Sequence, residues 1–154
     1  MDFMTILQPG AIKVLGSVSS KRRLFQSLGE VAASVYGISP NDAMDALQDR
    51  ENLGPTGVGK GVALPHARMP GLTGVSAVFL RTETPIDFGS VDRQPVDLFF
   101  ALFAPEEAGV EHLKALALVS RTMRDSGICA KLRANLDPTT LHTILTETLP
   151  SQAA

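Results

Sequence analysis

The sequence VSAVFLRT at residues 75–82 and the sequence VDLFFALF at residues 96–103 are short apolar runs bounded by glycine and proline. Both are rich in β-branched and aromatic residues, which is typical of strands buried on both faces. The connecting segments PIDFG (85–89) and DRQP (92–95) indicate turns or a short edge hairpin. We therefore expect these two runs to be central strands of one sheet.

Helical patterns lie on both sides of these strands in the sequence. Residues 20–36 carry a helical apolar face, with Ser19 or Ser20 as N-cap and Gly37 as the stop. A second helix is expected to begin at Ser39-Pro40, because a hydroxyl followed by proline is a common start signal. The positions expected to face the core are Leu24, Leu28, Val31, Ala32 and Val35 in the first helix, and Ala43, Met44 and Leu47 in the second.

Three further helices are expected after the strands. The first spans about residues 110–124, and two shorter ones follow, the last of which begins at Asp137-Pro138. The expected inward positions are Leu113, Leu116, Ala117, Ser120 and Met123, and then Leu141, Ile144, Leu145 and Leu149. The order of helices, strands and helices predicts a single α/β domain over residues 1–154. We expect a mixed β-sheet sandwiched between helical layers, a three-layer α/β/α arrangement.

Composition excludes several classes of function. The 154 residues contain 14 Lys and Arg against 16 Asp and Glu, a net charge of −2, which gives no basic surplus for nucleic acid. A single cysteine, Cys129, cannot form an intramolecular disulfide, and it is most simply a small buried hydrophobe. No basic leader is present, and no apolar run approaches the roughly 18 residues of a membrane span. We expect a soluble, cytoplasmic protein without membrane insertion.

The segment LGPTGVGKGVALPHARM at residues 53–69 has the texture of a functional loop, because its closely spaced glycines oppose a stable helix. Gly54, Gly59 and Lys60 match part of a nucleotide phosphate loop. Gly61 follows where that motif requires Ser or Thr for Mg²⁺, and Pro65 interrupts the helix the motif needs. A nucleotide-binding loop is therefore disfavoured.

His66 directly follows this loop and is the main candidate for chemistry. A neutral imidazole is nucleophilic near pH 7 and can form an N–P bond reversibly. The preceding loop, with Thr56, Gly57, Gly59 and Gly61, offers main-chain N–H groups to an anion, and Arg68 adds a weaker candidate cation. Taken alone, a structural histidine at a strand end explains the same residue.

Other polar residues admit two interpretations each. His112 could reach a crevice at the strand ends or be a partly exposed helix-cap side chain, and His142 is expected at the surface. Arg50 could bring a cation to the glycine loop or merely solvate a helix end. Asp97 is either a buried carboxylate that needs a partner or a strand-end residue. The three histidines lack the spacing of a metal site, so neither a metal nor a cofactor is expected.

Three blocks together resemble one known family. The sequences ENLGPTGVGKGVALPHAR, TPIDFGSVDRQPVDLFFALFAPE and EHLKALALVSRTMRD resemble the enzyme IIA domain of the mannitol/fructose type in the phosphoenolpyruvate-dependent phosphotransferase system. The resemblance is strongest to the nitrogen-regulatory branch and covers nearly the whole chain. It implies a mixed sheet between helical layers. Ala67 stands where many relatives have Gly, which concerns the loop geometry more than the chemistry.

The resemblance also implies roles for individual residues. His66 would accept a phosphoryl group from an HPr-type phosphohistidine donor, and Arg50 would neutralise the developing charge. His112 would hydrogen-bond the phosphate or orient His66. For the nitrogen-regulatory branch it implies control of targets such as potassium-transport proteins or sensor kinases. A sugar-transport IIA that passes phosphate to a IIB domain, and a binding module that is never phosphorylated, remain alternatives.

Overall fold

The computed structural model describes residues 2–107 and 109–153. Its helices are α1 (Phe3–Ile6), the 3₁₀ turn η1 (Pro9–Ala11), α2 (Lys21–Tyr36), α3 (Pro40–Asn52), α4 (Val110–Met123), α5 (Ser126–Arg133) and α6 (Pro138–Ala153). Its strands are β1 (Ile12–Leu15), β2 (Gly57–Gly59), β3 (Val62–Ala63), β4 (His66–Met69), β5 (Ser76–Ile86) and β6 (Val96–Pro105).

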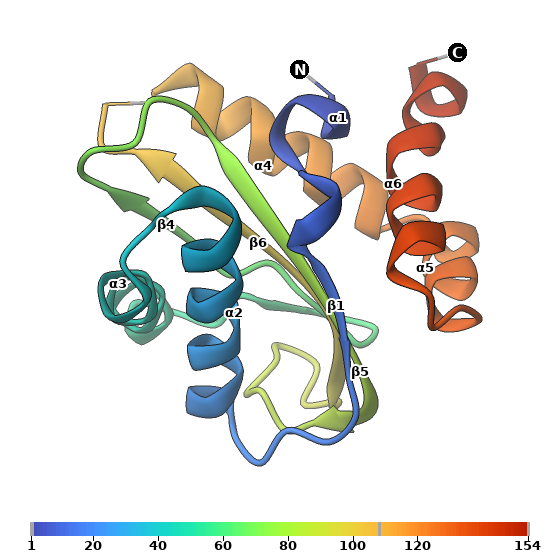
Figure 1. Ribbon diagram of the computed structural model, residues 1–154. Coiled ribbons are helices and arrows are strands. Elements are labelled where there is room, and N and C mark those ends of the chain that lie inside the picture. The colour runs from blue at the N-terminus through green and yellow to red at the C-terminus, as the bar shows by residue number, and fades with distance from the viewer. Residues whose placement is uncertain (1, 108, 154) are drawn as a thin grey trace.

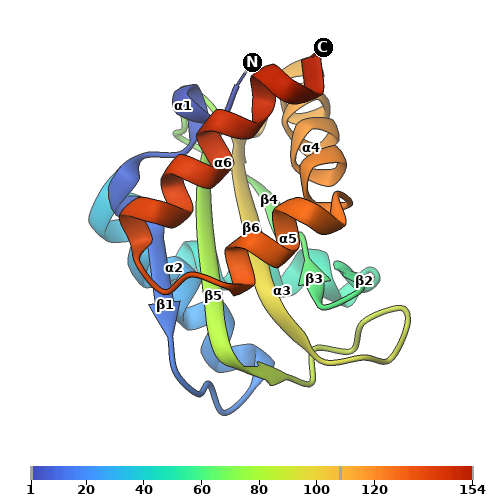
Figure 2. The same cartoon turned by 90° about the vertical axis from the view of Figure 1, so that its right-hand side faces the viewer.

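The described strands form one six-stranded mixed sheet in the order β1-β5-β6-β3-β2, with β4 also paired to β6. β5 and β6 are antiparallel, whereas β1 runs parallel to β5, and β3 and β4 both run parallel to β6. α2 and α3 cover one face of the sheet, and α4, α5 and α6 cover the other (Figures 1 and 2). The three-layer α/β/α expectation is confirmed.

The two apolar runs are the centre of the sheet, as predicted. The side chains of Phe79, Phe99, Phe100 and Phe103 are fully buried. The Phe100 ring packs against Phe79 at 5.7 Å and against Phe3 of α1 at 5.1 Å between centroids. Because helices cover both faces, β6 is apolar almost continuously and does not alternate with polar residues. Burial of these rings supplies much of the hydrophobic stabilisation.

The helix boundaries follow the local signals in the sequence. The Ser20 hydroxyl accepts a hydrogen bond from Arg23 N, and Gly37 ends α2 with a φ of 70°. Ser39 caps α3 and Pro40 is its first residue. The predicted inward face of α2 is confirmed, with Leu24, Leu28, Val31 and Ala32 buried and Val35 partly buried, as is that of α3, with Ala43 and Leu47 buried and Met44 partly buried.

The predicted inward face of α4 is wrong. Leu113 is 62% exposed, and the buried positions form the neighbouring stripe. That stripe consists of His112, Ala115, Leu118, Val119, Thr122 and Met123. The sequence of α4 contains two overlapping apolar stripes, and the direction in which the helix meets the sheet selects between them.

The C-terminal part differs from expectation in two further ways. α6 has 16 residues and is not a short helix, with Leu141 and Leu145 buried and Ile144 partly buried. The predicted inward position Leu149 lies outside the residues whose side chains the structure describes. His142 is partly buried, with Nε2 3.0 Å from the Leu7 carbonyl oxygen, because the N-terminal segment packs against α6. Its expected place on a polar surface is therefore wrong.

The remaining local expectations are resolved by tertiary contacts. Asp97 is a mostly buried carboxylate, and Arg133 of α5 donates to both of its oxygens at 2.8 to 3.1 Å. Cys129 is buried and behaves as a core residue. The glycine-rich segment 53–69, expected as a loop, contains the three short strands β2, β3 and β4. None of the described helices is long and apolar enough to cross a membrane.

Candidate functional site

His66 is the first residue of β4 and lies opposite Leu102 of β6. The two residues before it separate β3 from β4, and the Pro65 carbonyl accepts a hydrogen bond from Leu102 N at 2.9 Å. The His66 ring turns back along the chain, so that Nδ1 lies 2.8 Å from the Leu64 carbonyl oxygen. A carbonyl only accepts, so Nδ1 carries the ring proton and Nε2 carries the lone pair.

Arg50, in the last turn of α3, meets that lone pair. Its Nε donates to His66 Nε2 at 3.2 Å, and one terminal nitrogen donates to the Gly54 carbonyl at 2.9 Å. Arginine has no acceptor, which independently requires Nε2 to be the unprotonated nitrogen. α3 packs beside β4 (Figure 1), and this contact brings together two residues that are 16 positions apart in sequence.

His112 approaches His66 from the other helical layer. It lies in the first turn of α4, and its ring centroid is 5.7 Å from that of His66, with the planes tilted by 51°. The residue is 6% exposed, and its buried Nδ1 has no hydrogen-bond partner among the described residues. The interpretation of His112 as a partly exposed cap residue is therefore wrong, because α4 presents it inward.

Burial keeps both imidazoles neutral. Burial lowers the pKa of His66 from its ordinary value of 6.5, and the Arg50 charge lowers it further, against opposing effects from the Leu64 carbonyl and Glu51. The pKa of His112 is also lowered, first by burial and then by the charges of His66 and Arg68. Both shifts favour the uncharged ring, which is the nucleophilic form.

The two histidines open onto a pocket with an apolar rim. The pocket has a volume of about 480 Å³, and Arg50, Arg68, Leu53, Leu113 and Leu116 also line it. Leu53 is 84% exposed and Leu113 is 62% exposed, on opposite helical layers. Large apolar side chains exposed around a polar centre are typical of a surface that another protein covers.

The glycine-rich segment is directed elsewhere by its contacts. The Gly57 carbonyl accepts from Val91 N, and a Cβ on Gly57 would touch Ser90. The Gly59 and Gly61 positions face Asp92 and the Arg133–Asp97 pair respectively.

Thr56 is buried and bonded to Glu51. None of Thr56, Gly57, Gly59 and Gly61 lines the pocket at His66, whereas Arg68 does. Their predicted part in a phosphate-binding loop gains no support from these contacts.

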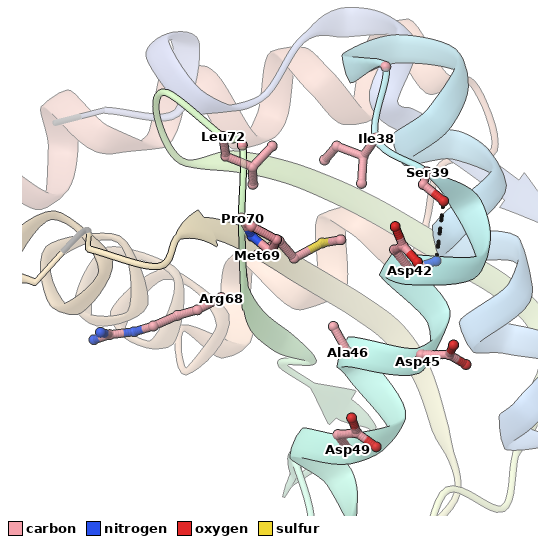
Figure 3. A pocket seen from close by; sticks show the side chains of 12 residues that line it. Ile38, Ser39, Asp42, Asp45, Ala46, Asp49, Arg68, Met69, Pro70 and Leu72 are labelled. Carbon is pink, nitrogen blue, oxygen red and sulfur yellow. Dashed lines mark hydrogen bonds between the residues drawn. The ribbon is translucent and has the colours of Figure 1, made fainter.

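A second hollow continues from the His66 pocket along α3 (Figure 3). It has a volume of about 570 Å³ and shares Ala46, Asp49 and Arg68 with the first pocket. Asp42, Asp45 and Asp49 line its α3 side. Although it is the larger hollow, it contains no histidine, so the chemistry is assigned to the smaller one. No group of three or more His, Cys, Asp or Glu within residues 2–107 and 109–153 is placed to hold a metal ion.

Sequence reasoning did not find three parts of the site. It missed the Leu64 carbonyl, although the dipeptide step from Leu64 to His66 across a proline is short enough to have suggested a local contact. It missed Leu53 on the rim, because an exposed leucine carries no periodic signal. It also assigned Leu113 to the core.

Comparison with known proteins agrees with this geometry. Residues 5–148 match the family model described as phosphoenolpyruvate-dependent sugar phosphotransferase system, EIIA 2. The chain is 43% identical over 145 residues to a nitrogen regulatory protein of Bradyrhizobium diazoefficiens, covering 94% of this chain and 95% of the relative. It is 29% identical over 147 residues to a fructose-specific EIIA component of Haloferax volcanii, covering 95% and 96%.

The fold also matches a solved structure. The crystal structure of nitrogen regulatory protein IIA-Ntr from Neisseria meningitidis superposes with a TM-score of 0.84 at 36% identity, covering 92% of this chain and 97% of that chain. The family match, the full-length similarity and the shared fold lead to one conclusion. This chain belongs to the EIIA type 2 family of the phosphoenolpyruvate-dependent sugar phosphotransferase system, the mannitol/fructose type, and resembles its nitrogen-regulatory members.

Proposed function

We propose that this protein is a cytoplasmic phosphocarrier that accepts a phosphoryl group on Nε2 of His66 and uses its phosphorylation state to regulate other proteins. EIIA domains are phosphoryl carriers that interact with phosphocarrier donors and IIB partners. One observation carries the proposal for this chain. The Nε2 lone pair of a neutral, half-buried histidine faces a pocket between Arg50 and a second neutral histidine.

The transfer step needs no metal or cofactor from this protein. His66 Nε2 attacks phosphorus as the N–P bond of an HPr-type donor breaks, and the electron pair of that bond returns to the donor nitrogen. The His66 Nδ1 proton stays in its hydrogen bond to the Leu64 carbonyl, which stabilises the positive charge developing on the ring. The atoms and electrons balance between two histidine rings.

Arg50 and His112 have separate tasks in this step. Before transfer, Arg50 Nε holds the attacking lone pair in place. As the N–P bond forms, the guanidinium shifts its donors to the phosphoryl oxygens and offsets their charge. A ring N–H of His112 donates to another phosphoryl oxygen, and Arg68 adds positive charge at the rim of the pocket.

The output we propose is regulatory. A phosphoryl group at His66 adds about two negative charges beside the apolar rim, where a partner docks. The targets implied by the resemblance are potassium-transport proteins or sensor kinases, which would bind the two states with different affinity. The fructose-named relative keeps a second function open, in which the phosphoryl group passes on to a IIB domain.

Intact-protein mass measurement tests the proposal. The wild-type protein and the His66→Ala variant are each incubated with phosphoenolpyruvate, enzyme I and an HPr-type donor. We expect one acid-labile phosphoryl group on the wild type and none on the variant. An unmodified wild type beside a fully charged donor, or a labelled variant, would contradict the assignment. Rapid loss of the label to an added IIB domain would identify the sugar-transport function instead.

A further inference from the structure

A buried carboxylate lies directly behind the candidate site. The side chain of Glu51 is 3% exposed, and it follows Arg50 in the last turn of α3. Burying a carboxylate is costly unless its oxygens are paired and hydrogen-bonded. Here they are paired: Lys21 Nζ lies 2.6 Å from Oε2, Thr56 N donates at 3.1 Å, and the Thr56 hydroxyl donates to Oε1.

These contacts close the turn that carries the Arg50 acceptor. Arg50 donates to the Gly54 carbonyl, while Glu51 accepts from Thr56, so two adjacent residues of α3 hold the same short turn. The position of the Gly54 carbonyl sets one arm of the Arg50 fork. The other arm, Nε, is directed at His66 Nε2.

Lys21 connects this turn to the rigid core. Its ammonium group lies 4.5 Å from the centroid of the Phe88 ring, within cation–π range. Phe88 is 1% exposed and packs edge-on against Phe25 of α2 and Phe99 of β6. The carboxylate of Glu51 is therefore held by the first residue of α2, by the segment after α3 and, through Lys21, by the aromatic core.

We propose that Glu51 is a positioning residue for phosphoryl transfer, whose buried carboxylate fixes the turn after α3 and thereby holds the Arg50 guanidinium on His66 Nε2. The inference rests on the proposed function. Glu51 does not touch the reacting atoms, and it acts through Arg50. A displacement of a charge-stabilising group by about 1 Å is enough to slow a positioned reaction by about 100-fold.

The first test is a cycle of transfer rates. Glu51→Gln is nearly isosteric, keeps an acceptor for Thr56 and removes the charge that Lys21 pairs with. We expect it to slow phosphoryl transfer by about 10- to 100-fold when Arg50 is present. In an Arg50→Ala background the same substitution should change the rate by less than about twofold, because the group it positions is gone. Equal losses in both backgrounds, or no loss in either, would overturn the proposal.

The second test needs no phosphoryl donor. NMR titration of the His66 ring is compared for Glu51→Gln with and without Arg50. In the Arg50→Ala background, loss of the carboxylate charge alone should lower the pKa of His66, because Glu51 raises it. With Arg50 present, release of the guanidinium from Nε2 opposes that fall, so the pKa of His66 should fall less or rise. An identical change in both backgrounds would contradict the positioning role.

Controls separate this proposal from its neighbours. Asp45→Asn removes an exposed carboxylate from the same helix and should leave both readouts unchanged. Lys21→Arg retains the ion pair and should keep most of the transfer rate. Should Glu51→Gln fail to fold, Thr56→Val removes only the hydroxyl donor and should give a smaller effect in the same direction. If the wild type takes no phosphoryl group, the proposed function fails while the titration cycle still tests the coupling of Glu51 to Arg50.

Discussion

At the scale of single residues, the state of His66 follows from three contacts. The Leu64 carbonyl holds the proton on Nδ1, Arg50 occupies the lone pair of Nε2, and burial opposes a charge on the ring. Each of these would be unremarkable alone. Together they leave a neutral ring with one nucleophilic nitrogen directed at a charged fork.

The first prediction concerns stability and pH. The pKa values of His66 and His112 lie below 6.5 in the folded protein, so the unfolded chain binds protons first as pH falls. Their contribution to stability is complete above pH 6.5 and is lost as pH falls below that value toward the folded pKa values. Urea unfolding at about pH 8 and about pH 5.5 should show a smaller fall for the His66→Ala variant than for the wild type. An equal fall in both would show that His66 contributes nothing to the acid sensitivity.

The second prediction concerns the fork of Arg50. Arg50→Lys keeps the charge but cannot donate to His66 Nε2 and to the Gly54 carbonyl with fixed geometry. We expect phosphoryl transfer to slow by about 10-fold or more, and Arg50→Ala to cost about 100-fold. Single-turnover labelling from a charged donor measures both rates. A lysine variant at the wild-type rate would mean that charge alone is needed.

At the scale of secondary structure, the packing of α2 against α3 decides where Arg50 lies. Gly29 of α2 is the point of closest approach, since a Cβ there would lie 2.7 Å from the Pro40 carbonyl oxygen at the start of α3. Pro40 begins the helix whose last turn carries Arg50. The small residue on one helix thus sets the position of a functional residue on the other.

The third prediction follows from this contact. Gly29→Ala should raise helix propensity by about 1 kcal/mol, yet the clash with a backbone oxygen must push the helices apart. We expect a net loss of about 1–3 kcal/mol in the free energy of unfolding, measured by urea denaturation. Gly16→Ala serves as the control, because a Cβ on Gly16 meets nothing within 4 Å. Stabilisation by Gly29→Ala would show that the two helices can separate freely.

At the scale of the whole molecule, the candidate site exists only where two helical layers meet at the sheet. Arg50 and Leu53 come from the layer of α3, whereas His112 and Leu113 come from α4, and His66 of β4 lies between them. The exposed leucines belong to both layers, so one partner surface can cover both. This arrangement favours docking of a folded protein over binding of a small molecule.

The fourth prediction tests that rim. Leu113→Ser should weaken productive docking of the donor and raise the apparent KM for it by about 10-fold, because an exposed apolar contact is lost on binding. The free energy of unfolding should change by less than about 0.5 kcal/mol. Leu136→Ser, at a leucine that is 56% exposed in the connection between α5 and α6, is the matched control. Equal effects of the two variants on KM would remove Leu113 from the docking surface.

The sequence by itself determined the elements whose signals are local. Ser20 and Gly37 bound α2, Ser39 and Pro40 begin α3, and Asp137 accepts a hydrogen bond from Thr140 N at the start of α6. These signals act between residues a few positions apart, so they do not depend on the rest of the fold. The two apolar runs were equally plain, because only a buried strand of a covered sheet tolerates such continuous hydrophobicity.

Only the tertiary structure decided how these elements combine into a site. It selected the buried stripe of α4 and so turned His112 inward and Leu113 outward. It placed Arg50 on His66 Nε2, and it directed the glycine-rich segment toward Asp92 and Arg133 and away from His66. The physical reason is the same in each case. Which face of an element is buried, and which donor meets which acceptor, depends on surfaces that distant parts of the chain supply.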